Sequence, residues 1–156
     1  MKRYAYILGI LLVIIMSSCE EKEVEAGFEG LVKQSILDYL KENPEEFSSF
    51  LSILESGGID KMMAGHNPGA LGYTLFLPNN NAIDEFIQQS NEFSSLNDLL
   101  NNQEYVKVLS RYHVLDNMVR SNEFPFGAFA DPTLSDDYLT VSFFIEPDTS
   151  YYKINN

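Results

Sequence analysis

A nearly uninterrupted apolar run opens the chain. Tyr4 to Met16 is a stretch of thirteen residues without a charged side chain, and the basic residues Lys2 and Arg3 precede it. A helix that crosses a bilayer needs about 20 apolar residues, so this run is too short for a permanent span and has the length of a signal-peptide core. We therefore expect residues 1–18 to form a signal peptide that is removed from the mature protein.

The only cysteine of the chain stands at the end of this run. Ser17-Ser18-Cys19 follows Met16, and this sequence resembles the lipobox of bacterial lipoprotein signal peptides, in which the cysteine thiol receives a diacylglyceryl group. The resemblance implies that Cys19 is the lipidated N-terminus of the mature chain, and two or more acyl chains anchor a protein durably in a membrane. The alternative interpretation is an ordinary secretory peptide with an incidental thiol.

An acidic segment separates Cys19 from the body of the chain. Glu20-Glu21-Lys22-Glu23 comes first and Gly27 ends the segment, so we expect residues 19–27 to form a flexible tether. An acidic stretch after a lipidated cysteine also resembles the surface-export signal of Bacteroidetes lipoproteins. Both interpretations stay open, and the second implies a lipid-anchored protein exposed on the bacterial outer membrane.

Helical spacing of apolar residues begins at Phe28 and continues to Leu40, which predicts a first amphipathic helix. Asn43 then precedes Pro44, a pair that favours an N-cap followed by the first position of a second helix. This second helix carries a stripe of phenylalanine and leucine and ends at Gly57. The N-terminal part of the body is therefore predicted to be helical.

The second half of the body mixes strands and helices. A compact strand is predicted over residues 73–77, with Tyr73 and Phe76 on opposite faces. An asparagine-rich turn then leads into three predicted helices, at residues 82–87, 96–100 and 104–112, and Asn79–Asn81 cap the first of them. Apolar and polar residues alternate over residues 139–145, which predicts a half-buried strand, and residues 151–155 return as another strand after a turn.

Three sequence boxes in this order resemble a fasciclin domain. The family opens with a helix of the type Phe-Ser-x-Phe-Leu-x-x-Leu-Glu-x-x-Gly, which residues 47–58 match closely. A strand and turn of the type Tyr-Thr-x-Phe-x-Pro-x-Asn-x-Ala follows, matched by residues 73–82, where Asn79 replaces the usual threonine cap. The third box is Tyr-His-Val, present at residues 112–114, and residues 153–156 resemble the strand that precedes the last third of the domain.

This resemblance implies a mixed α+β fold over residues 28–156, in which N-terminal helices pack on a β-wedge. The family's closing strand, of the type Asn-Gly-x-Ile-His-Val, is absent from the sequence, so we expect a fasciclin-like domain that lacks its final strand. The resemblance also implies a cell-surface lipoprotein without catalytic activity or cofactor, which mediates adhesion or binds an extracellular protein or polysaccharide. The alternative is an accessory lipoprotein that captures glycans for a polysaccharide-uptake system, and an extracellular hydrolase is a third class.

Charge and composition exclude several classes of function. The chain has 10 Lys and Arg against 23 Asp and Glu, and its net charge of −13 repels nucleic acids and anionic headgroups. One cysteine and two histidines exclude a disulfide framework and a Cys-rich zinc site. We find no nucleophile elbow, phosphate loop, zinc-protease motif or calcium loop, and the adjacent acids Glu45-Glu46 and Asp136-Asp137 are typical of solvated positions. We therefore expect no enzyme activity and no metal.

Two groups of residues remain as candidate binding sites. His113 follows Tyr112 at the end of a predicted helix, a setting typical of a buried, neutral imidazole satisfied by a backbone group or a carboxyl group. Burial predicts a lowered pKa for His113, whereas the family resemblance implies partner binding at Tyr112 and His113. The aromatic loop at residues 124–129 either folds back on the core or presents Phe126 and Phe129 to sugar rings or a protein partner.

Overall fold

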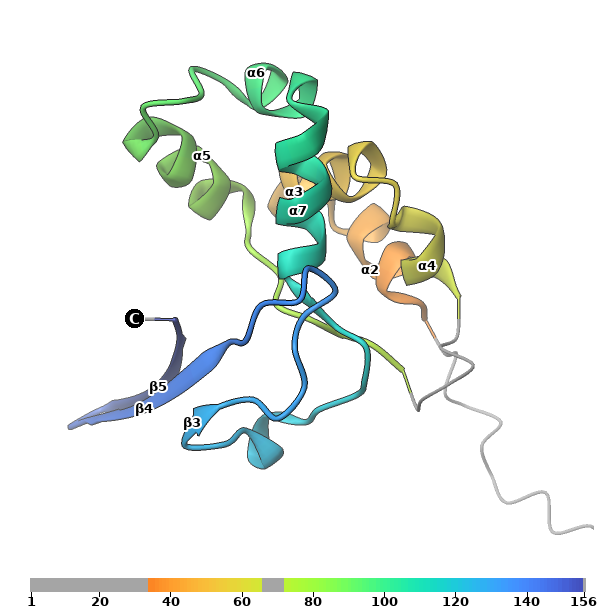
Figure 1. Cartoon of the computed structure of the whole chain (residues 1–156). Helices are drawn as coiled ribbons and strands as arrows, with labels where there is room; N and C mark the ends of the chain where they lie inside the picture. The colour runs from red at the N-terminus through yellow and green to blue at the C-terminus, as the bar shows by residue number, and fades with distance from the viewer. Residues whose placement is uncertain (1–33, 66–71, 156) are drawn as a thin grey trace, which may run out of the picture. The chain divides into compact units, whose positions relative to one another are not determined.

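The computed structural model describes residues 34–65 and 72–155. The predicted signal peptide, the tether and Cys19 lie outside the described residues, as do the first turns of the helix expected from Phe28. None of the helices in the described residues is long and apolar enough to cross a membrane. Helices dominate the N-terminal part of the described chain and small antiparallel sheets its C-terminal part (Figure 1), which gives the expected α+β architecture.

The N-terminal helices are delimited by local capping. Ser35 begins this part by accepting a hydrogen bond from the backbone N–H of Asp38. Asn43 is the N-cap residue of the following helix as predicted, but its side chain donates to the Tyr39 carbonyl at 2.8 Å instead of capping that helix. Pro44 occupies the first helical position, where no amide hydrogen is needed. The resulting helices are α2 (Ile36–Glu42), α3 (Pro44–Ser56) and α4 (Asp60–Ala64).

Three further helices contact α3. They are α5 (Asn80–Gln89), α6 (Leu96–Asn101) and α7 (Gln103–Tyr112). Asn79 caps α5 as predicted, because its side chain accepts from the backbone N–H of Ala82 at 2.9 Å. Both α5 and α7 pack on α3, as do α2, α4 and α6. The long central helix α3 therefore organises the helical part (Figure 1).

Five short strands of the described chain form two antiparallel sheets. The strand predicted at residues 73–77 pairs over only two residues, and the backbone N–H of Phe76 adds one bond to the His113 carbonyl at 2.9 Å. The second sheet has the order β3-β4-β5. The two sheets consist of β1 (Thr74–Leu75) with β2 (Val114–Leu115), and β3 (Gly127–Ala128) with β4 (Thr140–Glu146) and β5 (Thr149–Ile154).

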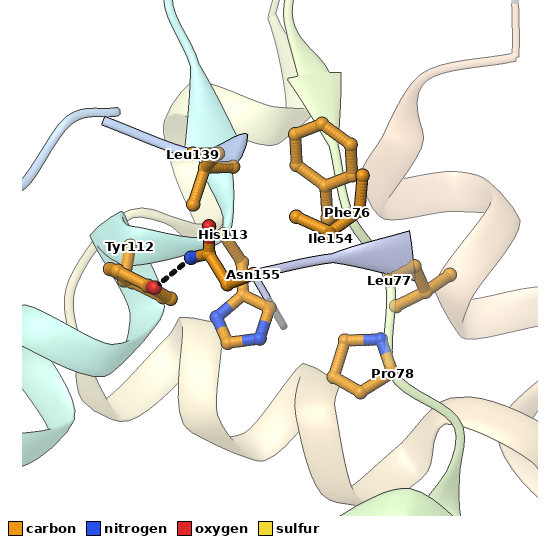
Figure 2. Close-up of a pocket in the computed structure, with 8 residues that line it drawn as sticks. All are labelled: Phe76, Leu77, Pro78, Tyr112, His113, Leu139, Ile154 and Asn155. Atoms are coloured by element: carbon orange, nitrogen blue, oxygen red, sulfur yellow. Dashed lines mark hydrogen bonds between the residues drawn. The ribbon is translucent and has the colours of Figure 1, made fainter. Parts of the chain in front are cut away.

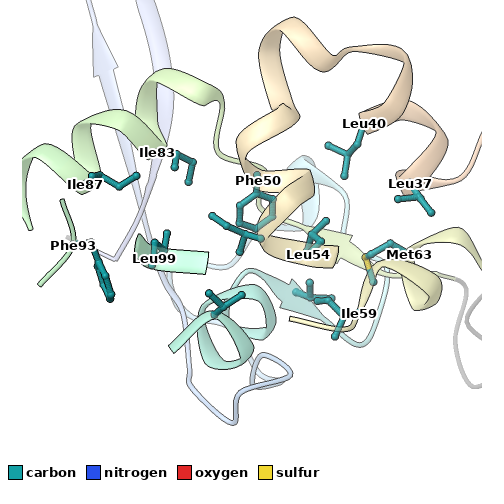
Figure 3. Packing of buried hydrophobic residues seen from close by; sticks show 13 residues of the cluster. Leu37, Leu40, Phe50, Leu54, Ile59, Met63, Ile83, Ile87, Phe93 and Leu99 are labelled. Carbon is teal, nitrogen blue, oxygen red and sulfur yellow. The ribbon is translucent and has the colours of Figure 1, made fainter. Parts of the chain in front are cut away.

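Two apolar clusters hold these elements together. The larger cluster lies among the helices and includes Phe50 and Leu54, both fully buried (Figure 3). The smaller cluster lies under the second sheet and is formed by Leu115, Phe129, Leu139 and Val141. Tyr73 packs on the larger cluster and Phe76 on the smaller one, so the prediction that they point to opposite faces is confirmed. The residues that flank β1 on its two sides therefore contact the two apolar clusters.

The outer half of the β4–β5 hairpin differs from the prediction. Val141 is buried as expected for a half-buried strand, but residues 143–146 are exposed on both faces of the ribbon. Ile145, at 78% exposure, is the extreme case. The alternation of apolar and polar residues indicated a strand correctly, but it could not show that no other element covers this end of the strand in the described residues.

Candidate functional site

The Tyr112-His113 pair lies where α7 meets β2. His113 is the residue that ends α7, and its Nδ1 lies 3.0 Å from the carbonyl oxygen of Leu109, one turn earlier. A carbonyl only accepts, so Nδ1 carries the hydrogen and Nε2 keeps a free lone pair. The imidazole also packs on the buried ring of Phe50, with centroids 4.9 Å apart. The backbone partner predicted for His113 is therefore confirmed.

Burial sets the charge of this imidazole. Desolvation lowers the pKa of His113 below its ordinary value of 6.5, and the hydrogen bond to Leu109 opposes this shift with a smaller effect. The side chain is neutral at pH 7 as a result, which confirms the predicted direction of the pKa shift. Part of the ring remains accessible, because His113 is half-buried and lines a surface pocket. No described residue makes a hydrogen bond to Nε2, which leaves this acceptor for a ligand.

Tyr112 is held by Asn155, the residue that follows β5. The side chain of Asn155 donates a hydrogen bond to the Tyr112 hydroxyl (Figure 2). Asn155 is itself fixed, because its Oδ1 accepts from the backbone N–H of Thr140 at 2.8 Å and its backbone has a positive φ of 51°. Asparagine tolerates this left-handed conformation better than most residues. Asn155 is a site residue that no local pattern could reveal, since it lies 43 positions from Tyr112.

These residues line a pocket of about 380 Å³. Its polar groups come from Tyr112, His113 and Asn155, which Figure 2 shows together at the pocket. Its walls are apolar and consist of Phe76, Leu77, Pro78, Leu139 and Ile154. A hollow with apolar walls and a few convergent polar groups is the usual form of a specific binding site. The volume suits one aromatic side chain or a small molecule.

Tyr112 and His113 also line a second hollow. It measures about 430 Å³ and lies between α5 and α7, with Phe86, Tyr105, Val108 and Leu109 as further lining residues. Both residues predicted from the sequence therefore line two hollows. A partner that fills either hollow would lie against this pair.

The aromatic loop is divided between core and surface. Phe129 is only 5% exposed and packs edge-on against Phe76 with centroids 5.7 Å apart, so its predicted role in an aromatic contact surface is wrong. Phe124 contacts Phe129 as well, at 5.4 Å, and folds toward the core. Phe126 differs, because it is 90% exposed. The interpretation of a loop folded back on the core holds for Phe129, and only Phe126 can meet a partner from solvent.

The acidic pairs do not converge on a site. Glu45 and Glu46 are exposed in the first turn of α3, where carboxylates stabilise the helix N-terminus. Asp137 accepts a hydrogen bond from the Ser135 hydroxyl at 2.7 Å, and Asp136 occupies a left-handed turn position with φ of 67°. Across residues 34–65 and 72–155, no three histidine, cysteine, aspartate or glutamate side chains gather closely enough to hold a metal ion.

Comparison with known families identifies the domain. Residues 45–156 match the family model described as Fasciclin domain. This region contains α3 except for Pro44, both sheets and every residue that lines the Tyr112-His113 pocket. A search of curated proteins finds no match to the chain.

Proposed function

Because the chain belongs to the fasciclin-domain family, we propose that it is an adhesion or binding protein whose partner site is the pocket around Tyr112 and His113. Domains of this family are generally non-catalytic adhesion domains. The observation that carries the proposal is the neutral His113, which lines a largely apolar pocket and whose Nε2 accepts no hydrogen bond from the described residues. A half-buried acceptor that has no partner among the described residues can bind a ligand that supplies a donor.

The pocket chemistry defines the ligand group. The walls are hydrocarbon and aromatic, so the ligand group is apolar over most of its surface. It carries one hydrogen-bond donor for His113 Nε2, and the Tyr112 hydroxyl offers a second polar contact. A tyrosine or tryptophan side chain of an extracellular protein has this combination of an apolar ring and a donor. We propose that such a side chain is what the pocket takes.

Location at the cell surface is part of the same proposal. Cys19, directly after an apolar run and two serines, supports lipidation and a mature chain anchored in the bacterial outer membrane. The acidic residues after it support export to the outer face. A tethered domain with a small pocket suits contact with large extracellular partners, because many copies on one membrane can bind the same partner with a higher avidity than one copy alone.

Two small probes test the pocket. We expect 4-methylphenol, which has a donor, to bind the full chain roughly two- to tenfold more tightly than toluene, which has none. Nitrogen chemical shifts of the His113 ring report the contact, and only the phenol should move Nε2. His113→Phe should remove the preference between the probes, while Phe126→Ala, outside the pocket, should leave it intact. Equal affinity for both probes in the unmodified chain would refute the proposed site.

The exposed Phe126 favours a second candidate, glycan capture. An exposed aromatic ring can stack on the apolar face of a sugar, and this ring is almost fully exposed. Glycan-array binding that is lost in Phe126→Ala and kept in His113→Phe would support this candidate. Binding that depends on neither residue would refute it.

A further inference from the structure

The second hollow beside Tyr112 and His113, which we call the α5–α7 hollow, has a wall of packed aromatic rings. Tyr105 meets the buried ring of Phe93 edge-on, with centroids 4.7 Å apart, and stacks on Phe86 at 6.5 Å. These ring contacts hold Tyr105 in place. All residues that line the hollow come from α5, α7 and His113, so neither β4 nor β5 shapes it.

Val108 makes this hollow apolar up to its mouth. Its side chain is 54% exposed in the middle of α7, although the residues beside it in the hollow, Phe86 and Leu109, pack on the larger apolar cluster. An exposed apolar side chain next to a hollow loses contact with water when a ligand covers it, which favours binding. The hollow therefore suits an apolar side chain of a partner.

A negative charge acts on this hollow from the segment between α5 and α6. Burial raises the pKa of the Tyr105 hydroxyl, and the carboxylate of Glu92 raises it further, because two negative charges so close together repel each other. Glu92 is exposed. Its field at Tyr105 disfavours an anion and favours a cation beside the ring.

Two further carboxylates lie beside residues of the hollow. Glu85 directly precedes Phe86 on α5, and Glu104 lies one turn before Val108 on α7. Both are exposed. No ion pair in the described residues involves Glu85, Glu92 or Glu104. These three charges are therefore available to a partner.

The basic residues of α7 do not neutralise this group of carboxylates. Arg111 is directed toward α3, because its Nη1 donates to the Gly57 carbonyl at 3.0 Å and to the Lys107 carbonyl at 2.9 Å. Neither Arg111 nor Lys107 lines the hollow. The chain from Asn80 to His113 has five acidic residues and only these two basic ones.

We propose that the α5–α7 hollow takes an apolar side chain of the same extracellular protein that fills the Tyr112-His113 pocket, with a lysine or arginine of that protein next to this side chain and facing Glu92. The inference rests on the proposed function, because Tyr112 and His113 line both hollows and one partner can therefore meet both. It adds the class of partner, a protein segment with adjacent apolar and basic residues. The carboxylates attract such a segment and repel an acidic one, which gives specificity.

Two peptides of similar size test the charge preference in the full chain. We expect acetyl-phenylalanyl-lysine amide to bind the α5–α7 hollow roughly two- to fivefold more tightly than acetyl-phenylalanyl-glutamate amide. About 1 M sodium chloride should remove the preference, because salt at this concentration screens exposed charges beyond about 3 Å. Methyl signals of Leu109 report binding in this hollow, and those of Leu139 report the Tyr112-His113 pocket, since Leu109 lines only the first and Leu139 only the second.

Variants locate the effect. Val108→Lys, which adds a cation at the mouth of the hollow, should abolish the response of Leu109 to the lysine peptide. Ile145→Lys adds the same charge to an exposed position of β4 and should preserve this response. Glu92→Gln should reduce the preference for the lysine peptide. Its matched control, Glu55→Gln, removes an exposed carboxylate of α3 and should leave the preference unchanged.

The outcomes separate this inference from the proposed function. Equal binding of the two peptides at low salt, or a preference that Glu92→Gln leaves unchanged, would overturn the inference while the 4-methylphenol test at His113 still stands. If the lysine peptide shifts only Leu139, the α5–α7 hollow is not its site and the inference is wrong. If Leu109 responds as expected but His113 does not distinguish 4-methylphenol from toluene, the proposed function fails instead.

Discussion

The side chain of Asn80 joins the start of α5 to the first turns of α3. Its Oδ1 accepts a hydrogen bond from the backbone N–H of Ser49 at 2.9 Å, and its Nδ2 donates to the Glu45 carbonyl at 2.9 Å. One amide thus uses both its acceptor and its donor on backbone groups of a helix more than 30 positions earlier. The contact orients α5, which forms one side of the second hollow near His113.

Asn80→Ala should lower the free energy of unfolding by about 1–3 kcal/mol, because two backbone groups lose a partly buried partner. Asn80→Asp keeps the acceptor for Ser49 and loses the donor. Its free energy of unfolding should therefore lie between that of the unmodified chain and that of Asn80→Ala. Urea melts followed by circular dichroism measure the difference. The neighbouring exposed residue supplies the control, and Asn81→Ala should change stability by less than about 0.5 kcal/mol. Equal effects at both positions would contradict the assigned role.

Gly57 is required for the close approach of α3 and α7. A Cβ atom at this position would lie 2.2 Å from the Ser110 hydroxyl oxygen and 2.7 Å from its Cβ, and Ser110 is fully buried. Gly57→Ala should therefore cost about 1–3 kcal/mol through overpacking. Addition of Ser110→Gly should recover part of the loss in the same denaturant melts.

Gly58 provides the contrast to Gly57. It has a φ of +72°, and a methyl group added here would meet no described atom within 4 Å, so Gly58→Ala costs only backbone strain, about 1 kcal/mol. Ser110→Gly should not rescue this variant. If it rescued both alanine variants equally, the contact between Gly57 and Ser110 would not be the cause.

His113 should make stability depend on pH. Its pKa is lower in the folded chain than the unfolded value of about 6.5, so the unfolded chain binds the proton more readily. This contribution to stability is complete above pH 6.5 and declines as the pH falls from there toward the lowered folded pKa. His113→Ala should lose about 1–3 kcal/mol at pH 7.5 and show a flatter decline to pH 5.5.

Denaturant melts at these two pH values check the prediction for His113. His66 is the control, since it is the other histidine of the chain and lies outside the described residues. His66→Ala should keep the slope of the unmodified chain. If His113→Ala had the same free energy of unfolding as the unmodified chain at both pH values, the imidazole would not stabilise the fold. Its role would then be limited to the pocket.

Cys19 should carry the membrane anchor. Cells grown with labelled palmitate should incorporate the label into the chain and retain it in the membrane fraction, because two or more acyl chains bind durably. Cys19→Ser should abolish labelling and leave an unprocessed precursor on gels. Labelling that persists in Cys19→Ser would show that the lipobox interpretation is wrong.

Local sequence was a reliable guide to where helices begin. Asn79 caps α5 and Pro44 opens α3 as predicted, because a cap depends on residues only two or three positions away. The prediction was wrong in one detail at Asn43. Its side chain donates to the carbonyl of Tyr39 in the preceding helix and does not cap α3. Whether a side chain caps the helix that follows or the helix before it depends on the angle between the two helices.

The candidate site could be predicted only in part. Tyr112 and His113 were recognisable from a family sequence box, and burial correctly predicted the lowered pKa of His113. Asn155 was not recognisable, because its contact with Tyr112 exists only after β5 has paired along β4. No periodicity in a sequence encodes a hydrogen bond between segments that distant.

The sequence by itself determined the order of most helices and longer strands, the starts of α3 and α5, the acidic charge and the family, since each depends on neighbouring residues or on composition. Tertiary structure alone decided which aromatic residues face solvent. Phe126 and Phe129 lie three positions apart in one loop, yet the first is 90% exposed and the second 5%. Their chemistry is identical, so burial was decided by the path of the chain, which places Phe129 against Phe76 and leaves Phe126 open to water.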